Sequence, residues 1–519
     1  MTSMRSGQRE TPPFLQFLDR QLRLSLRAGR TEVLSFDIYR MDFSPWRLRF
    51  SDHTPVLHVS EIDVRALSPR EIFQSLRDVV YTRGYGEQNP IVLVDGDGTD
   101  LREEVRTHLL PIVILDQADQ NRVLASRRPS AELLDCISPQ LTLSLLAPYE
   151  TSKPVTGSRF FGREFDIRKI LYAGDANFAV MGIRRIGKTS LLREIERRLK
   201  EQAESAEGKQ TAERILFMDC SAIRTPDHFV QEVVRQLAPR EMARLQHRQF
   251  PLYFPDFLAR MSRQYKGALV FLFDEFDALL KAPFGQSNLL DQLRAASNSG
   301  HCRFVIAGFR ELLNAFSDQN SPLYNFANPL RLKEFSRDET TNLILSPMES
   351  LGVHFERRNE VVDRIYDETG GQPNLIQYYC SILIENLDRR KERSISPENL
   401  SHVYHDEDFR AFVLNTFMDN TSHLEKALVY AVLLEASDND RVTAEERFAM
   451  EDIDNALQSR GIDILLGDLE SSCRQLELAG IFAKQGIHYH FATPVFPDVL
   501  RSGYNMNYLL RKVREEGIW

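Results

Sequence analysis

The chain has 519 residues, more than one hydrophobic core usually organises, so its length predicts roughly three or four domains. Hydrophobic residues make up 42% of the chain and charged residues 27%, and this composition excludes a fibrous or largely disordered protein. The formal net charge of −9 excludes a global positive field, so binding to nucleic acid or to anionic lipid would need a local basic patch.

The sequence predicts a cytoplasmic protein that has no membrane partner. No stretch of about 18 apolar residues occurs, and the opening residues MTSMRSGQRE lack the apolar segment of a secretory signal. The cysteines are scattered singly, without the CxxC pairs or Cys/His clusters of a zinc site. They predict buried free thiols, at Cys136, Cys220, Cys302, Cys380 and Cys473.

Residues 1–148 predict a small α/β domain. An amphipathic run from Phe14 to Arg27 predicts a surface helix. Three apolar runs predict strands, at 56–59, 91–94 and 112–115. Helical segments separate them, and the first of these opens with Ser68 as N-cap and Pro69 at its first position. This alternation predicts a parallel sheet.

Acidic residues collect at the ends of these strands, namely Glu61, Asp63, Asp95, Asp97 and Asp116. Carboxylates at the carboxyl edge of a parallel sheet can bind Mg²⁺, as phosphoryl-transfer and nuclease-like sites require. Asp-Gly is also an ordinary turn sequence. We favour a protein-interaction domain here and keep a metal-dependent effector site as the alternative.

The polar, turn-rich segment 149–158 predicts a linker, which is followed by a core domain over 159–335. The core holds four continuous apolar runs, which suit strands buried on both faces of a parallel sheet, at 178–181, 215–218, 268–273 and 303–307. Helical spacing over 336–408 predicts a helical lid. The remaining residues, 409–519, predict a winged-helix domain of three helices and a hairpin that turns at Gly486.

The segment 182–189 reads Gly-Ile-Arg-Arg-Ile-Gly-Lys-Thr and follows an apolar strand, which is the pattern of a phosphate-binding loop. Its glycines let backbone N–H groups curl around a β-phosphate, Lys188 reaches the β- and γ-phosphates, and the Thr189 hydroxyl serves Mg²⁺. The following helix adds its positive N-terminal end. The predicted nucleotide-binding residues are Gly182, Ile183, Arg184, Arg185, Ile186, Gly187, Lys188, Thr189 and Ser190.

A second apolar strand, 268–273, runs into Asp274 and Glu275. Ligands bind at the carboxyl edge of an open parallel sheet, so these carboxylates are expected beside the phosphate-binding loop. Asp274 is the predicted Mg²⁺ ligand, and Glu275 is the predicted general base that polarises the attacking water.

Two further positions lie where the γ-phosphate could be sensed. Arg310 follows the strand 303–307 and is a candidate sensor and catalytic residue, although a helix-capping or surface arginine is the alternative. The segment Thr369–Asn374 opens a helix whose N-terminal end could close over a nucleotide, with a simple turn as the alternative.

These motifs together resemble a known family. The segments Phe161-Gly162-Arg163-Glu164, 182–192, Phe-Asp-Glu-Phe at 273–276 and Thr-Gly-Gly-Gln-Pro at 369–373 are similar to STAND and archaeal-type ATPases of the AAA+ superfamily, and to origin-recognition ATPases. The resemblance covers about residues 158–505. It implies ATP or ADP with Mg²⁺ as cofactors. It also implies that Phe161, Gly162 and Arg163 lie by the adenine and that Pro373 belongs to the lid.

The resemblance further implies a switch that is closed with ADP and often oligomeric with ATP. Two departures leave its trigger open: the chain carries no repeat array, and Arg331 is only a weak candidate for an arginine finger. The sequence also lacks an NKxD-type guanine motif, which favours ATP over GTP.

The charge of the predicted winged helix bears on DNA binding. Its third helix, 467–479, carries Asp468, Glu470 and Glu477 against Arg474, so it would be repelled by phosphates and favours docking to protein. The wing keeps DNA open, with Lys484, His488 and His490.

Three functional hypotheses follow from these features. The first is a STAND-like ATPase switch in signalling or defence that forms a homo-oligomer or binds a protein partner. The alternative is a DNA-associated AAA+ ATPase of the origin-recognition or transposition-regulator type. A third reading makes nucleotide a structural ligand of a binding scaffold.

Overall fold

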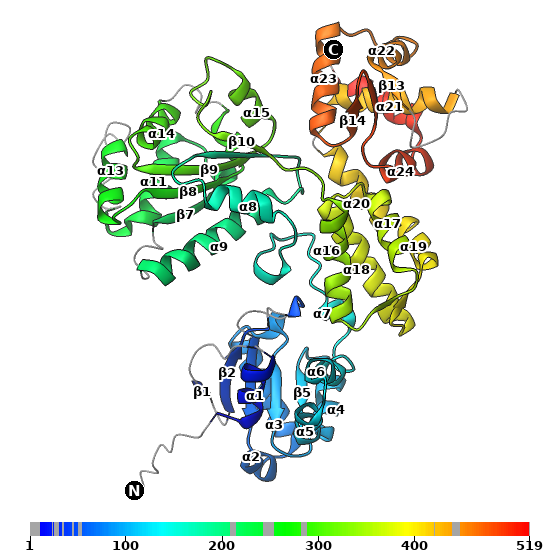
Figure 1. Cartoon of the computed structure of the whole chain (residues 1–519). Coiled ribbons are helices and arrows are strands. Elements are labelled where there is room, and N and C mark those ends of the chain that lie inside the picture. Colours follow the sequence, from blue (N-terminus) through cyan, green and yellow to red (C-terminus); the bar gives the residue numbers. More distant parts are fainter. Residues whose placement is uncertain are drawn as a thin grey trace. The chain divides into compact units, whose positions relative to one another are not determined.

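The computed structural model describes residues 11–22, 24, 31–33, 36–43, 46–49, 54–207, 214–241, 254–281, 288–419, 421–438 and 447–517. Its elements form two compact units. One comprises Met1–Tyr149, Thr341–Val361 and Cys380–Asn399, and the other comprises Glu150–Thr340, Val362–Tyr379 and Leu400–Trp519. The segment 336–408, expected to form a lid, therefore contributes to both units. Figure 1 traces these elements along the chain.

The N-terminal sheet has the strand order β1-β2-β3-β4-β5. Its strands are β1 (Thr31–Val33), β2 (Phe36–Met41), β3 (Thr54–Val59), β4 (Ile91–Val94) and β5 (Val113–Leu115). The parallel pairing of β3, β4 and β5 is the one that the sequence predicts. The sequence interpretation missed β1 and β2, which pair antiparallel beside β3.

Helices surround this sheet in sequence order. They are α1 (Pro13–Leu22), α2 (Glu61–Ala66), α3 (Pro69–Thr82), α4 (Thr99–Thr107), α5 (Gln117–Ala125), α6 (Pro129–Ile137) and α7 (Leu143–Leu146). Helix α1 ends at Leu22, and residues 23 and 25–27 of the predicted first helix lie outside the described residues. Helix α3 begins as predicted: the Ser68 hydroxyl accepts from the Glu71 N–H, Glu71 accepts from the Ser68 N–H, and Pro69 stands at the first position.

The second unit holds a fully parallel sheet with the order β10-β6-β9-β8-β7. Its strands are β6 (Phe178–Met181), β7 (Ile215–Asp219), β8 (Leu269–Asp274), β9 (Cys302–Gly308) and β10 (Asn328–Arg331). The helices of this core are α8 (Glu164–Leu171), α9 (Lys188–Glu207), α11 (Pro226–Leu237), α13 (Phe254–Gln264), α14 (Leu289–Asn298) and α15 (Arg310–Ser317). Four of the strands are the predicted ones, and β10 was missed.

Both faces of this sheet are covered, which explains its continuous apolar runs. On β8, Phe271 and Phe273 belong to one hydrophobic cluster, while Val270 and Leu272 belong to another. Since successive side chains of a strand point to opposite faces, each cluster fills one side of the sheet.

The chain after β10 is mainly helical. It contains α16 (Arg337–Ser350), α17 (Arg358–Thr369), α18 (Pro373–Arg390), α19 (Pro397–Tyr404) and α20 (Glu407–Met418), with a short parallel pair of β11 (His354–Phe355) and β12 (Ser394–Ile395). The C-terminal part contains α21 (His423–Asp438), α22 (Met450–Gln458), α23 (Leu466–Leu478), β13 (Phe448–Ala449), β14 (Phe482–Gln485), β15 (His488–Phe491), α24 (Val495–Gly503) and α25 (Met506–Glu516). The expected three helices and hairpin are present, and Gly486 turns the hairpin with φ +65°.

Two expectations from composition can be compared with this fold. All the cysteines are buried free thiols, as predicted. Burial raises the pKa of Cys302, Cys380 and Cys473 to about 12. Among the helices that the structure describes, none is long and apolar enough to cross a membrane.

Candidate nucleotide site

The predicted phosphate-binding loop connects the end of β6 at Met181 to the start of α9 at Lys188. Two residues in this loop have left-handed backbone, Arg185 with φ 65° and Gly187 with φ 100°. Gly182 does not have positive φ, so it serves the loop differently from the expected conformational role. A Cβ at Gly182 would lie 2.8 Å from Cγ2 of Ile186, so the close approach of the loop to itself requires a glycine there.

The Lys188 side chain lies within the curl of this loop. Its Nζ donates to the carbonyl oxygens of Gly182 at 2.9 Å and Ile183 at 3.0 Å. The residue is only 7% exposed. Burial lowers the pKa of Lys188, while the nearby carboxylates of Glu275 and Asp274 oppose this shift. The ammonium group is therefore fixed at the loop, where a phosphate would find it.

Thr189 and Asp274 meet at the carboxyl edge of the sheet. The Thr189 hydroxyl donates to Oδ2 of Asp274 at 2.5 Å, and Asp274 is 3% exposed. Strand β9 lies between β6 and β8, so the two motifs are not on adjacent strands. Helix α9 brings Thr189 to the end of β8 across this gap. The predicted pair of a hydroxyl and a carboxylate for Mg²⁺ is thus brought together.

The two carboxylates after β8 share an environment that disfavours their charge. Burial raises the pKa of Asp274, although the hydrogen bond from Thr189 and the charge of Lys188 lower it. Burial also raises the pKa of Glu275, again opposed by Lys188. Glu275 has left-handed backbone with φ 48°, which is strained for a residue with a side chain. Such strain is common where a side chain must be aimed at a reaction.

The segment Phe161–Arg163 packs beside the loop and the start of α16. Phe161 is buried, and Gly162 has φ 68° with no room for a Cβ, which would lie 2.8 Å from Oε1 of Glu339. The Arg163 N–H donates to that Glu339 oxygen at 2.8 Å. Its guanidinium donates to the carbonyl of Lys333 and, at 3.5 Å, to the carbonyl of Ile186. Arg163 therefore binds protein carbonyls and ties the loop to the segment before α16.

The arginines of the loop point their side chains toward the helices that follow the core. The Arg185 guanidinium donates to the Thr416 hydroxyl at 3.2 Å and lies 4.9 Å from the centre of the Phe412 ring. Arg184 lies 4.0 Å from the Asp419 carboxylate. Only the backbone N–H groups of these arginines are thus expected to face a phosphate, as the sequence motif implies. Their side chains connect the loop to α20.

Arg310, the predicted sensor, is the first residue of α15 and forms a bidentate ion pair with Glu425 of α21. Its Nη1 and Nη2 atoms lie 2.7 Å from Oε1 and Oε2 of Glu425, whose side chain is 4% exposed. The Ser422 N–H also donates to Glu425, at 3.1 Å. Sequence reasoning missed Glu425, because the acid lies 115 positions away on a different element.

The Thr-Gly-Gly-Gln-Pro segment forms the junction between the core and the helices after it. Gly370 and Gly371 have φ of 59° and 71°, and the Phe335 N–H donates to the Gly371 carbonyl at 2.8 Å. The Gln372 amide donates to Glu334 at 3.2 Å. Pro373 then opens α18. The glycines are needed here because a Cβ on Gly371 would lie 2.6 Å from the Phe335 carbonyl oxygen.

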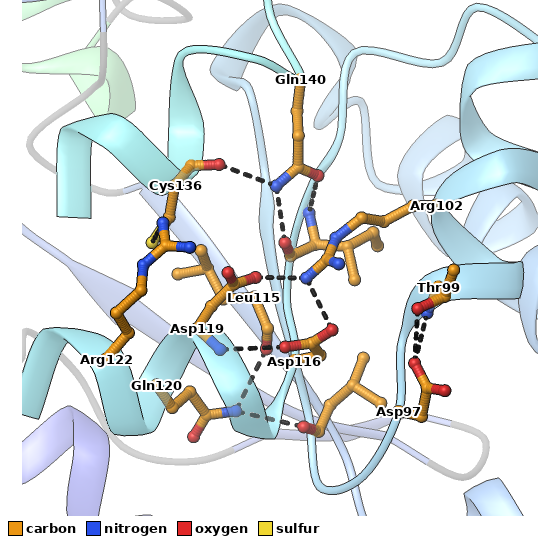
Figure 2. A network of polar contacts seen from close by, with 12 residues as sticks. Asp97, Thr99, Arg102, Leu115, Asp116, Asp119, Gln120, Arg122, Cys136 and Gln140 are labelled. Atoms are coloured by element: carbon orange, nitrogen blue, oxygen red, sulfur yellow. Dashed lines mark hydrogen bonds and ion pairs between the residues drawn. The ribbon is translucent and has the colours of Figure 1, made fainter. Parts of the chain in front are cut away.

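The acids of the N-terminal sheet do not assemble the alternative metal site. Figure 2 shows Arg102 reaching both Asp116, at 2.8 Å, and Asp119. Asp97 accepts from the Thr99 N–H and hydroxyl, at 2.9 Å and 2.6 Å.

The other acids of this edge are also engaged. Asp95 lies 2.9 Å from His58, Asp63 caps α2, and Glu61 pairs with Arg65. Across the described residues, no group of three or more His, Cys, Asp or Glu side chains could hold a metal ion. The Mg²⁺ hypothesis for this edge is therefore wrong, because partners on the same domain already use its carboxylates.

The residues of the core loop fit a magnesium-bound nucleoside triphosphate. Two of the three protons of the Lys188 ammonium go to loop carbonyls, which leaves one for a phosphate oxygen. A Cβ at Gly187 would meet no heavy atom within 4 Å, so open space lies beside the backbone there. Mg²⁺ binds one or two protein oxygens together with substrate phosphates, which matches the Thr189 and Asp274 pair.

Fold and site together define a P-loop protein with the AAA+ fold, an α/β sheet with associated helices. Residues 173–316 match the family described as the AAA domain. No match was found among curated proteins.

Solved structures with a similar fold include the Walker-type ATPase PABY2304 of Pyrococcus abyssi. It has 17% sequence identity and a TM-score of 0.50, and the match covers 68% of this chain and 99% of that one. The Aeropyrum pernix ORC2 protein, solved as ADPNP–ADP complexes, has 14% identity and a TM-score of 0.48 over 70% of this chain and 95% of that one. The Aeropyrum pernix ORC1 protein, solved with DNA, has 15% identity and a TM-score of 0.38 over 71% and 95%.

Proposed function

We propose that this protein is a magnesium-dependent ATPase. In this proposal the loop N–H groups and Lys188 bind the phosphates, Thr189 and Asp274 hold Mg²⁺, and Glu275 takes a proton from the attacking water. When bound, Mg²⁺ neutralises charge on the phosphate oxygens. The single observation that carries the proposal is the contact between the Thr189 hydroxyl and the buried Asp274 carboxylate, beside the fixed Lys188 ammonium.

A single-turnover assay tests this proposal. Excess full-length protein is mixed with ATP, and the release of phosphate is followed with Mg²⁺ and, in parallel, with EDTA. We expect ATP to be hydrolysed with Mg²⁺ and to remain intact with EDTA, since two oxygen ligands without the cation cannot neutralise the phosphates. Tight ATP binding without any hydrolysis would contradict the enzymatic part and favour the scaffold, in which the nucleotide is structural.

We further propose that the nucleotide state controls how the core contacts the helices that follow it. Two ion-bearing contacts support this. Arg310, next to the end of β9, pairs with Glu425, and Arg185, within the loop, binds Thr416. A phosphate in the loop would compete for the position of these arginines or of their backbone. The finer assignments, namely a STAND-type switch, a C-terminal winged helix, a lid formed around Pro373 and an ATP-dependent homo-oligomer, belong to this proposal.

DNA association is the second candidate function. The observation that favours it is the β14–β15 hairpin, which exposes Lys484 and His488 near its turn. The exposed acids Asp468, Glu470 and Glu477 of α23 act against it, because they repel phosphates. A protein partner on α23 is the corresponding reading for a STAND-type switch.

Binding to a DNA duplex at several salt concentrations separates these functions. If the wing carries DNA binding, the affinity falls as salt rises and Lys484→Ala weakens it by about tenfold, the effect of losing a phosphate contact. The matched control is Lys512→Ala, an exposed lysine of α25. Equal affinities for the wild type and the Lys484 variant would remove the wing from DNA recognition.

A further inference from the structure

A carboxylate that the proposed mechanism does not use links the turn after β8 to the end of β9. Asp277 lies in the short turn Phe276–Leu279, which follows Glu275 directly. Its Oδ2 accepts the Phe309 N–H at 2.6 Å, and its Oδ1 accepts the N–H groups of Glu311 at 2.9 Å and Leu312 at 3.1 Å. A single side chain therefore receives three backbone hydrogen bonds from another element.

These bonds act as the N-terminal cap of α15. No side chain of the Phe309 N-cap position caps this helix. The first N–H groups of a helix lack partners within it, and a negative charge at this end is favourable. Hydrogen bonds to an ionised carboxylate are also stronger than those between neutral groups. Asp277 therefore fixes the start of α15, and with it Arg310, against the turn after β8.

A glycine makes this approach possible. A Cβ built on Gly308 would lie 2.3 Å from Oδ2 of Asp277 and 3.0 Å from Cβ of Leu312. These distances are too short for real atoms, so any side chain at 308 would force the carboxylate or α15 to move. Gly308 and Asp277 are therefore two halves of the same contact, and neither needs to touch a nucleotide.

The turn that Asp277 fixes is strained. Glu275 has φ 48°, and Phe309 has the unusual combination of φ −134° and ψ −107°. A strained backbone persists only where its surroundings hold it. The bonds from Asp277 join these two strained residues, because Asp277 follows Glu275 by two positions and accepts directly from Phe309. Without them, Glu275 is free to leave the left-handed conformation, and its carboxylate would move.

We propose that Asp277 is a positioning residue for ATP hydrolysis, which sets Glu275 and Arg310 in their places through the end of β9. This inference rests on the proposed ATPase function. In Asp277→Asn, one carboxylate oxygen becomes an amide NH₂, which can no longer accept from the Phe309 or the Glu311 and Leu312 N–H groups. A displacement of about 1 Å at a reacting group lowers a rate by about 100-fold.

The test compares rates and affinities in the full-length chain. For Asp277→Asn we expect the single-turnover rate to fall about 100-fold, while the Kd for ATP with Mg²⁺ changes by less than about twofold. Gly308→Ala is expected to give the same pattern from the other side of the contact. The control is Asp318→Asn, an exposed carboxylate at the opposite end of α15 that accepts only locally, from Asn320 at 2.9 Å. It should keep the wild-type rate.

Each outcome is decisive for the inference. A folded Asp277→Asn protein that turns over at the wild-type rate would overturn it. A parallel loss of rate, affinity and melting temperature would also overturn it, since that is the result of general destabilisation. If Asp277→Asn does not fold, Gly308→Ala carries the test alone. A wild-type protein that neither binds nor hydrolyses ATP would instead refute the proposed function, so the two failures are distinguishable.

Discussion

Replacing Lys188 with alanine is expected to weaken ATP binding by at least about 100-fold, because the variant removes the ammonium group that is fixed within the phosphate-binding loop. The loss of one partner from a buried, charge-assisted contact costs about 2–5 kcal/mol, and each 1.4 kcal/mol is about tenfold in Kd. Fluorescence anisotropy with a labelled ATP analogue and Mg²⁺ measures the change.

Lys200→Ala is the matched control for this experiment. Lys200 lies on the same helix, α9, and its Nζ pairs with Glu196 at 2.7 Å on a partly exposed surface. Removal of this lysine changes the net charge by the same amount but leaves the loop intact. Its Kd should equal that of the wild type. Equal weakening in both variants would show that the loss comes from overall charge, and an unchanged Kd in Lys188→Ala would remove the loop from nucleotide binding.

Replacing Glu275 with glutamine is expected to slow hydrolysis by about 10²–10⁴-fold, the usual contribution of a general base. Glutamine has nearly the same shape as glutamate but cannot take a proton from water. The phosphates and Mg²⁺ are held by other residues, so the Kd for ATP should change little. The variant should therefore accumulate with ATP bound, which is measured by chromatographic analysis of the nucleotide after rapid denaturation.

Glu232→Gln provides the comparison for Glu275. Glu232 lies on α11 of the same core and pairs with Arg235 at 2.5 Å, far along the chain from the loop motifs. It should hydrolyse ATP at the wild-type rate. A Glu275→Gln protein that releases ADP as fast as this control would assign the general base to another residue.

The sequence could predict the core of the fold because its signals are local. Each of the strands β6, β7, β8 and β9 is a continuous apolar run, and burial on both faces of a parallel sheet requires this pattern. Strand β10 has the sequence Asn-Pro-Leu-Arg, with exposed residues at most positions, so its pattern carries no such signal. It forms at the sheet edge because β6 offers it a free side for pairing.

The N-terminal sheet shows the same limit. Strands β3, β4 and β5 were predicted from apolar runs, whereas the segment of β2, Phe-Asp-Ile-Tyr-Arg-Met, mixes charges with apolar residues. Asp37 of this strand is nevertheless buried. The acids at the sheet edge have the composition of a metal site, but their partners decide the outcome. Arg102 neutralises Asp116, and this pairing depends on how α4 lies beside β5.

The candidate site divides in the same way. The loop residues and Asp274 are predictable because their motifs carry residue types at fixed spacing, and the fold brings Thr189 to Asp274. The contacts of Arg310 with Glu425 and of Asp277 with the start of α15 join elements that are distant in sequence. A carboxylate that caps a helix of another segment has no local signature, so only the folded chain reveals it.

The most direct test of the central claim is the titration of the full-length protein with ATP in a calorimeter, with Mg²⁺ and again with EDTA. The account predicts one site per chain with a Kd of about 10 μM or tighter, and an affinity at least about tenfold weaker when EDTA removes the cation that Thr189 and Asp274 hold. Absence of ATP binding under both conditions, or an affinity that is the same with and without Mg²⁺, would contradict it.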